Sequence, residues 1–174
     1  APSYREDEFF AAQVLSGLLG GGMSSRLFQE VRERRGLCYA IYSSAWGLKD
    51  TGLFAVHAAT GAGMVGELIN VVSDELDRMA DAGPKDAEVA RAKAQLKAGL
   101  MMSLESSSAR AEQMARKMLL HGRVLLTSDI LAAVDRVTAA EVTNVAQRLR
   151  RKDVSVAVVG AGRKSDDLAS RAGD

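Results

Sequence analysis

The chain has 174 residues, which suits one compact domain or two very small ones, and a domain of this size buries about 70% of its unfolded surface. The formal net charge of +1 gives no overall argument for binding nucleic acid or an anionic membrane. The single cysteine excludes an intrachain disulfide, and no apolar run approaches the roughly 18 residues of a membrane-spanning helix.

The N-terminal part of the chain predicts two helices with a glycine break between them. Residues 7–19 show apolar side chains at every fourth position, which indicates a helix. These side chains are Phe10, Val14 and Leu18. The run from Gly20 to Gly22 ends this helix. A second helix is expected from Ser25 to about Arg35, with Gly36 closing it.

Two strands are predicted next, at 37–46 and 51–60. Both segments are rich in β-branched, aromatic and small residues, and the turn-forming residues 47–50 lie between them. This arrangement is typical of a β-hairpin. Both faces of each strand are largely apolar, which indicates a sheet that is covered on both sides or packed tightly against a partner.

The C-terminal part of the chain is mostly helical by pattern. Helices are expected at 63–82, 86–120, 128–134 and 138–149, and a last strand at 153–159. Three serines, Ser106 to Ser108, are a weak point in the long second helix of this set. The order α-α-β-β-α-α-α-α-β predicts an α+β domain over residues 1–160, followed by a polar tail over 161–174.

Residues that could carry chemistry are few. Neither His57 nor His121 has a Cys, Asp or Glu nearby with metal-ligand spacing. We interpret His57 as a packed strand residue and His121 as a residue that interacts with a helix end. Cys38 lies in a predicted strand and is better explained as a small core residue than as a nucleophile. We therefore expect no catalytic residue and no metal site in this chain.

The second predicted helix is rich in charge. Four arginines and two glutamates alternate along it: Arg26, Glu30, Arg32, Glu33, Arg34 and Arg35. The simplest interpretation is a solvated face with ion pairs between residues four apart. Binding of nucleic acid by this helix is a weaker alternative, and its affinity should fall steeply with salt.

The run from Leu18 to Arg32, continued by Arg35 to Tyr39, resembles a segment of the mitochondrial processing peptidases and their bacterial relatives. Three further segments fit the same pattern: 50–54, 105–110 and 137–138. The resemblance extends from about Tyr4 to Gly160. It points to the insulinase (pitrilysin) group of zinc metallopeptidases, and within that group to the C-terminal half-domain.

The resemblance implies a pair of homologous α+β half-domains, with the H-x-x-E-H zinc motif in the N-terminal half. The cofactor zinc is therefore expected in that half, and this chain alone should be inactive. The implied partners are the N-terminal half-domain and an extended peptide substrate, with no nucleic acid and no membrane. A first strand just upstream of Ala1 is also implied, and a second copy or another strand-completing partner would cover that edge. The implied location is the bacterial cytoplasm, or the mitochondrial matrix in a eukaryote.

Two substrate-binding residues follow from the resemblance. Arg32 and Tyr39 match an Arg and a Tyr that reach into the zinc cleft and contact the substrate backbone. The turn at Gly36 is expected to bring the two side chains together. Without such a role, Arg32 would form a surface salt bridge and Tyr39 would be half-buried. The implied function is the substrate-clamping half of a zinc endopeptidase that cleaves peptides or presequence-like substrates, and the alternative is a non-catalytic structural or partner subunit.

Overall fold

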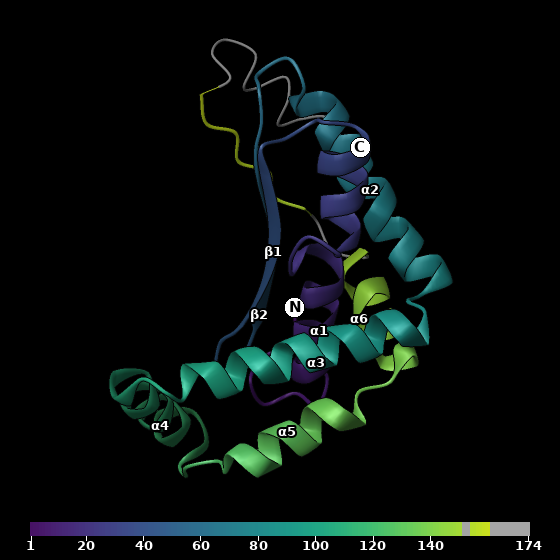
Figure 1. Cartoon of the computed structure of the whole chain (residues 1–174). Coiled ribbons are helices and arrows are strands. Elements are labelled where there is room, and N and C mark those ends of the chain that lie inside the picture. Colours follow the sequence, from purple (N-terminus) through teal and green to yellow (C-terminus); the bar gives the residue numbers. More distant parts are fainter. Residues whose placement is uncertain (151–153, 161–174) are drawn as a thin grey trace.

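The computed structural model describes residues 1–150 and 154–160, and its α+β architecture confirms the predicted class (Figure 1). Its elements are α1 (Phe9–Gly20), η1 (Phe28–Arg34), β1 (Ala40–Gly47), β2 (Gly52–Ala59), α2 (Val65–Ala82), α3 (Asp86–Ser103), α4 (Ser107–His121), α5 (Thr127–Arg136) and α6 (Ala139–Arg150). Helices and strands follow the predicted order up to residue 150, except that the long predicted helix is divided into α3 and α4. Within the described ranges, no helix has the length and apolar character needed to cross a membrane.

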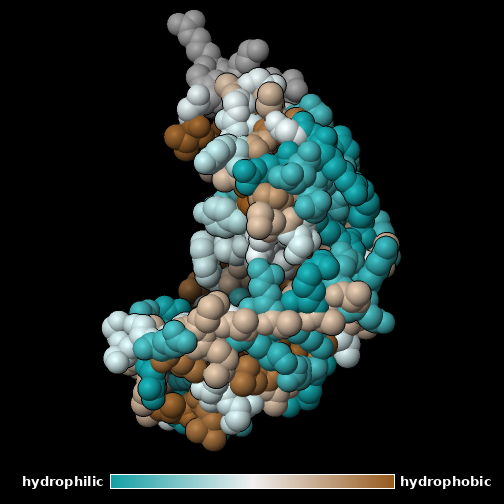
Figure 2. All heavy atoms as spheres, in the orientation of Figure 1, coloured by the Kyte–Doolittle hydropathy of each residue, from teal (hydrophilic) through white to brown (hydrophobic). Residues whose placement is uncertain are grey.

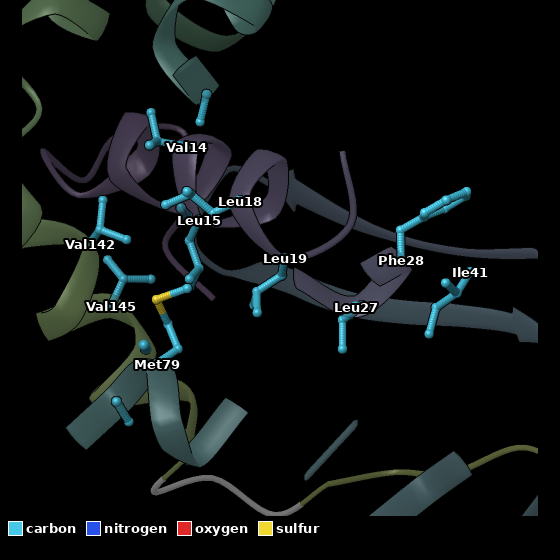
Figure 3. Close-up of a cluster of buried hydrophobic side chains, with 14 of the residues drawn as sticks. Val14, Leu15, Leu18, Leu19, Leu27, Phe28, Ile41, Met79, Val142 and Val145 are labelled. Carbon is cyan, nitrogen blue, oxygen red and sulfur yellow. The ribbon is translucent and has the colours of Figure 1, made fainter. Parts of the chain in front are cut away.

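Helix α1 is the centre of the fold. Eight of its 12 residues are buried, and it packs against β1, α3 and α6. A helix that is apolar on all sides requires neighbours on all sides, which these elements provide. Figure 3 shows Leu15 of α1 beside Met79 of α2, with Val142 and Val145 of α6 close by. The core therefore joins the first helix of the chain, α1, to the last described helix, α6.

The contact between α1 and β1 is unusually close. A Cβ atom added at Gly20 would lie 2.2 Å from the backbone nitrogen of Ser43, so no other residue fits there without a shift. The Ser43 hydroxyl donates a hydrogen bond to the Ser16 carbonyl (2.7 Å), and the Gln13 amide donates to the Ala45 carbonyl (2.8 Å). These contacts fix α1 on one face of the hairpin.

The hairpin has one covered face and one open face. In the antiparallel register, Tyr42 lies opposite His57 and Trp46 lies opposite Leu53. Side chains alternate between the faces of a strand, so these four residues share the face that points away from α1. Tyr42 and Trp46 are about half exposed, whereas Ile41 on the other face is buried. In Figure 1, α1, α2 and α6 lie on one side of the hairpin, whereas α4 projects past its lower end.

Two predictions about secondary structure are corrected. The second helix is in place, but residues Phe28–Arg34 form a π-helix, which is wider than the expected α-helix. The strand predicted at 153–159 is wrong for residues 154–159, which have no regular structure, and Asp153 lies outside the described residues. Val154 and Val159 are exposed, because an apolar segment forms a strand only where a neighbouring strand accepts its hydrogen bonds. The predicted tail over 161–174 also lies outside the described residues.

The long predicted helix divides at its serines. α3 ends at Ser103, and Ser106 begins α4 as its N-cap, where the hydroxyl accepts a hydrogen bond from the Ala109 backbone N–H at 3.3 Å. Serine side chains compete with the helical backbone for hydrogen bonds and are favoured at N-caps. α4 then extends away from the core, and none of its residues is buried.

An ion pair ties the start of the η1 segment to α3. Arg26 donates hydrogen bonds to both carboxylate oxygens of Glu88, at 2.9 and 2.8 Å, and a third to the Gly83 carbonyl at 3.1 Å. Bidentate pairs of this kind are among the stronger hydrogen bonds in proteins. The bonds from Arg26 lower the pKa of Glu88 from 4.5 to about 2, although burial opposes them.

We predict that Glu88→Gln destabilises the fold by about 2 kcal/mol at pH 7, because a charge-assisted pair is lost. The folded-state pKa of Glu88 lies below its usual value of 4.5, so its contribution is present above pH 4.5 and fades as the pH falls toward 2. Denaturant unfolding of both proteins between pH 7 and pH 2 measures this difference.

The matched control is Glu112→Gln, which makes the same chemical change in an exposed pair with Arg116. This control should leave the free energy of unfolding almost unchanged. A Glu88→Gln difference that stays constant across this pH range would contradict the assigned pKa.

Candidate functional site

The two candidate substrate-binding residues lie on either side of one turn. Arg32 belongs to η1, and Tyr39 directly precedes β1. The guanidinium carbon of Arg32 lies 5.7 Å from the centre of the Tyr39 ring and 4.7 Å from the centre of the Phe28 ring. Both distances are typical of cation–π contacts. The structure therefore brings Arg32 and Tyr39 together, while their contact with a substrate stays a prediction.

Gly36 makes this proximity possible. Its φ of +63° is in the left-handed region, which glycine enters without the strain that a side chain would cause. The Gly36 backbone N–H donates to the Arg32 carbonyl at 3.1 Å, and the Leu37 N–H donates to the Val31 carbonyl at 2.9 Å. The chain then reverses, and the Tyr39 N–H donates to the Ala59 carbonyl on β2 at 2.9 Å. Backbone bonds thus fix both ends of the turn.

The guanidinium of Arg32 is available for a ligand. Its neighbours Arg34 and Arg35 both pair with Glu30, at 2.8 and 3.1 Å. In the part of the chain that the structure describes, no carboxylate lies within 4.0 Å of Arg32. The surface salt bridge that would explain Arg32 without a function is therefore absent from these residues.

Tyr39 is equally open. Its side chain is 82% exposed, so the alternative of half-buried packing is wrong. Its phenol group has no hydrogen-bond partner among the described residues. A shallow hollow of about 330 Å³ lies beside it. The lining residues are Gly36, Leu37, Cys38, Tyr39, Ala59, Thr60, Gly61 and Met64. A ligand in this hollow would meet the phenol directly.

Phe28 is a part of the site that the sequence analysis did not identify. It is buried at the start of η1, and its ring lies beneath the Arg32 guanidinium. Residues four apart are neighbours on a helix surface, so the spacing of Phe28 and Arg32 was an available signal. Phe28 restricts the arginine side chain to one side of the turn, where Tyr39 lies.

The cysteine in this region is not a ready nucleophile. Cys38 is buried at the floor of the hollow, and this burial raises the pKa of its thiol. The positive charge of Arg32 acts in the opposite direction and lowers the same pKa. A thiol is a weak nucleophile compared with the thiolate, so Cys38 fits the structural role expected from the sequence.

The histidines do not build a metal site with their neighbours. His57 stacks on Tyr42, with ring centres 4.8 Å apart, and its Nε2 atom lies 3.2 Å from the Ser44 hydroxyl. His121 is the last residue of α4. Over residues 1–150 and 154–160, no three His, Cys, Asp or Glu side chains are grouped so that they could hold a metal ion. The described residues therefore do not fit a zinc site.

Comparison with known proteins places this chain in a family. A profile described as the peptidase M16 inactive domain matches residues 1–96, which is more than half of the chain. An uncharacterized zinc protease of Streptomyces coelicolor is 38% identical over 169 residues, which cover 97% of this chain and 36% of that protein.

Solved structures agree with this placement. A conserved protein from Enterococcus faecalis V583 has a TM-score of 0.74 and 27% identity, over 84% of this chain and 34% of its own. The peptidase M16 inactive domain from Pseudomonas fluorescens has a TM-score of 0.70 and 25% identity, over 84% of this chain and 35% of its own. The chain spans about a third of the length of each of these relatives. The resemblance to the insulinase group is thereby confirmed, and the chain belongs to the peptidase M16 family as its C-terminal, inactive domain.

Proposed function

We propose that this chain is the substrate-clamping half of a zinc-dependent endopeptidase. The observation that carries the proposal is an arginine without a carboxylate partner, among the described residues, beside an exposed tyrosine. Arg32 and Tyr39 would hold the backbone of an extended peptide next to the scissile bond. The relative from Streptomyces coelicolor is described as a zinc protease, which supports the class of reaction.

The chemistry of the two side chains suits a peptide backbone. Arginine carries five N–H donors and no acceptor, and the phenol of tyrosine can donate one more hydrogen bond. A peptide carbonyl accepts such bonds, and it accepts stronger ones when negative charge develops on its oxygen during hydrolysis. Arg32 and Tyr39 would therefore bind the substrate and stabilise the carbonyl oxygen as its charge grows.

The proposal assigns the metal to another part of the protein. The described residues do not fit zinc, and the relatives are about three times as long as the segment that matches. We place the zinc, its ligands and the general base in an N-terminal half-domain that faces Arg32 and Tyr39. Among the described residues the sheet has two strands, and its edges are suited to pairing with further strands, from that half or from a second copy. The bacterial cytoplasm stays the predicted location.

In the longer protein that carries both halves, we predict that Arg32→Ala lowers kcat/KM by roughly 100-fold, because a charged donor to the developing oxyanion is lost. Tyr39→Phe should lower it by roughly two- to tenfold, the effect of one neutral hydrogen bond. Initial rates on a fluorogenic peptide, with the zinc content of each variant measured in parallel, test both values.

Arg35→Ala is the matched control. Arg35 lies at the same end of the helix as Arg32, but its charge is paired with Glu30. This variant should keep kcat/KM close to that of the parent. Equal rates for Arg32→Ala and Arg35→Ala would refute the clamp. A longer protein that binds zinc-protease substrates without cleaving them would favour the non-catalytic alternative.

A second prediction concerns the position of the Arg32 charge. Cys38 is the only cysteine, so alkylation by iodoacetamide reports on its thiol alone. Replacing Arg32 by Gln removes a positive charge that lowers the pKa of this thiol. We therefore expect the pH profile of the alkylation rate to move to higher pH in Arg32→Gln.

The control for this measurement is Arg34→Gln, whose charge is already compensated by Glu30 at 2.8 Å. It should leave the alkylation profile in place. A profile that is the same in Arg32→Gln and the unaltered chain would show that the Arg32 charge does not act on the Cys38 thiol.

A further inference from the structure

The open face of the hairpin carries a row of large side chains, which we call the outer row: Tyr42, Trp46, Leu53 and His57. Tyr42 and His57 are stacked, with an angle of 18° between their rings, and Trp46 lies 6.1 Å from His57. Tyr42, Trp46 and Leu53 are each about half exposed. Clustered apolar side chains on a surface commonly mark a binding site.

This face carries no acidic side chain, lysine or arginine. By the register of the hairpin, eight residues point away from α1: Ala40, Tyr42, Ser44, Trp46, Leu53, Ala55, His57 and Ala59. None of them is Asp, Glu, Lys or Arg. An acidic or basic ligand would therefore find no opposite charge among them. Apolar groups would lose water on both sides of the contact, which favours their binding.

The geometry of the face suits an extended chain. Alternate side chains along a strand are about 6.6 to 6.8 Å apart, and an extended peptide has the same spacing on each of its sides. Tyr42 and Trp46 are four residues apart on β1, which is two such repeats or about 13 Å, and Ser44 lies between them on the same face. His57 and Leu53 lie opposite them on β2. In Figure 2 the molecule is crescent-shaped, and it is hollowed on the side where Figure 1 shows the hairpin.

The outer row is continuous with the candidate site. Ala59 belongs to the outer face of β2, and it also lines the hollow beside Tyr39. Its carbonyl accepts the hydrogen bond from the Tyr39 backbone N–H. Tyr42 of the outer row lies three residues after Tyr39 in the sequence. The hollow beside Tyr39 and the outer face of the hairpin therefore adjoin at Ala59, within reach of one extended peptide.

We propose that the outer row binds uncharged apolar side chains at alternating positions of an extended peptide, and so determines part of the substrate specificity. The identity of the ligand as a peptide rests on the function proposed above. The backbone would be held by Arg32 and Tyr39, and the side chains by Tyr42, Trp46 and Leu53. The outer row would thus select the peptide sequence, while the adjoining pair Arg32 and Tyr39 would hold the backbone of any sequence.

Trp46 provides the readout, since it is the only tryptophan in the chain. The experiment titrates the unaltered chain with three blocked ten-residue peptides that alternate threonine with leucine, serine or arginine. The leucine peptide should shift and saturate the Trp46 emission, with an affinity at least roughly tenfold higher than that of the serine peptide, because leucine buries more apolar surface.

The variants locate the binding surface. Tyr42→Ser should weaken binding of the leucine peptide by roughly tenfold, the effect of losing one buried apolar contact, and leave the serine peptide unchanged. Tyr42→Phe should bind like the unaltered chain, because the ring is retained. Leu119→Ser is the control, since it removes an apolar side chain that is 86% exposed on α4 and does not belong to the outer row. Circular dichroism checks that each variant is folded.

Each other outcome overturns the proposal. Equal affinity for the leucine and serine peptides, or an unchanged affinity in Tyr42→Ser, would show that the outer row does not select side chains. Tighter binding of the arginine peptide would assign the rings to cation–π contacts instead. No emission change with any peptide would show that the outer row does not bind these peptides.

Arg32→Ala separates this proposal from the function on which it rests. If Arg32 holds the backbone, the variant should weaken all three peptides by a similar factor. An effect of Tyr42→Ser without any effect of Arg32→Ala would refute the backbone clamp and leave the outer row as a peptide site.

Discussion

The close packing of α1 against β1 is the constraint on which the rest of this structure depends. Gly20 has no side chain, so the helix reaches the backbone at Ser43, and hydrogen bonds from Ser43 and Gln13 keep it there. Because α1 is buried on all sides, α3 and α6 must pack on its remaining surface. Helices α1, α3 and α6 thereby form one packed unit against one face of the hairpin, and among the described residues Tyr42 and Trp46 on the other face stay about half exposed.

The same packing determines where the site lies. Leu27 and Val31 are buried in the core, so the helical segment that contains them cannot rotate about its own axis. Arg32 follows Val31 and therefore points away from the core, over the ring of Phe28. The π-helical turn and Gly36 then return the chain to β1. Arg32, the candidate substrate-binding arginine, thus acquires a defined position from residues that are themselves buried in the core.

The sequence predicted those features that depend on local pattern. The helix at 63–82 and the hairpin around 47–50 were both identified, and Gly36 predicted the turn at which Arg32 and Tyr39 meet. Features that depend on tertiary pairing were missed. The strand predicted over 153–159 needs a neighbour to accept its hydrogen bonds, and the aromatic face around Tyr42 needs the register of the hairpin. Neither can be read from one segment alone.

The ion pairs around residues 26–35 distinguish Arg32 from the other three arginines of this segment, and they make it the one suited to bind a single peptide carbonyl. Arg26 is committed to Glu88, while Arg34 and Arg35 share Glu30. A polyanion such as nucleic acid is bound by several free cations at once, and three of these four arginines already contact a carboxylate. Arg32 remains as an isolated donor beside apolar rings, where a hydrogen bond is less exposed to competition from water. This environment favours recognition of one polar group on an otherwise neutral peptide.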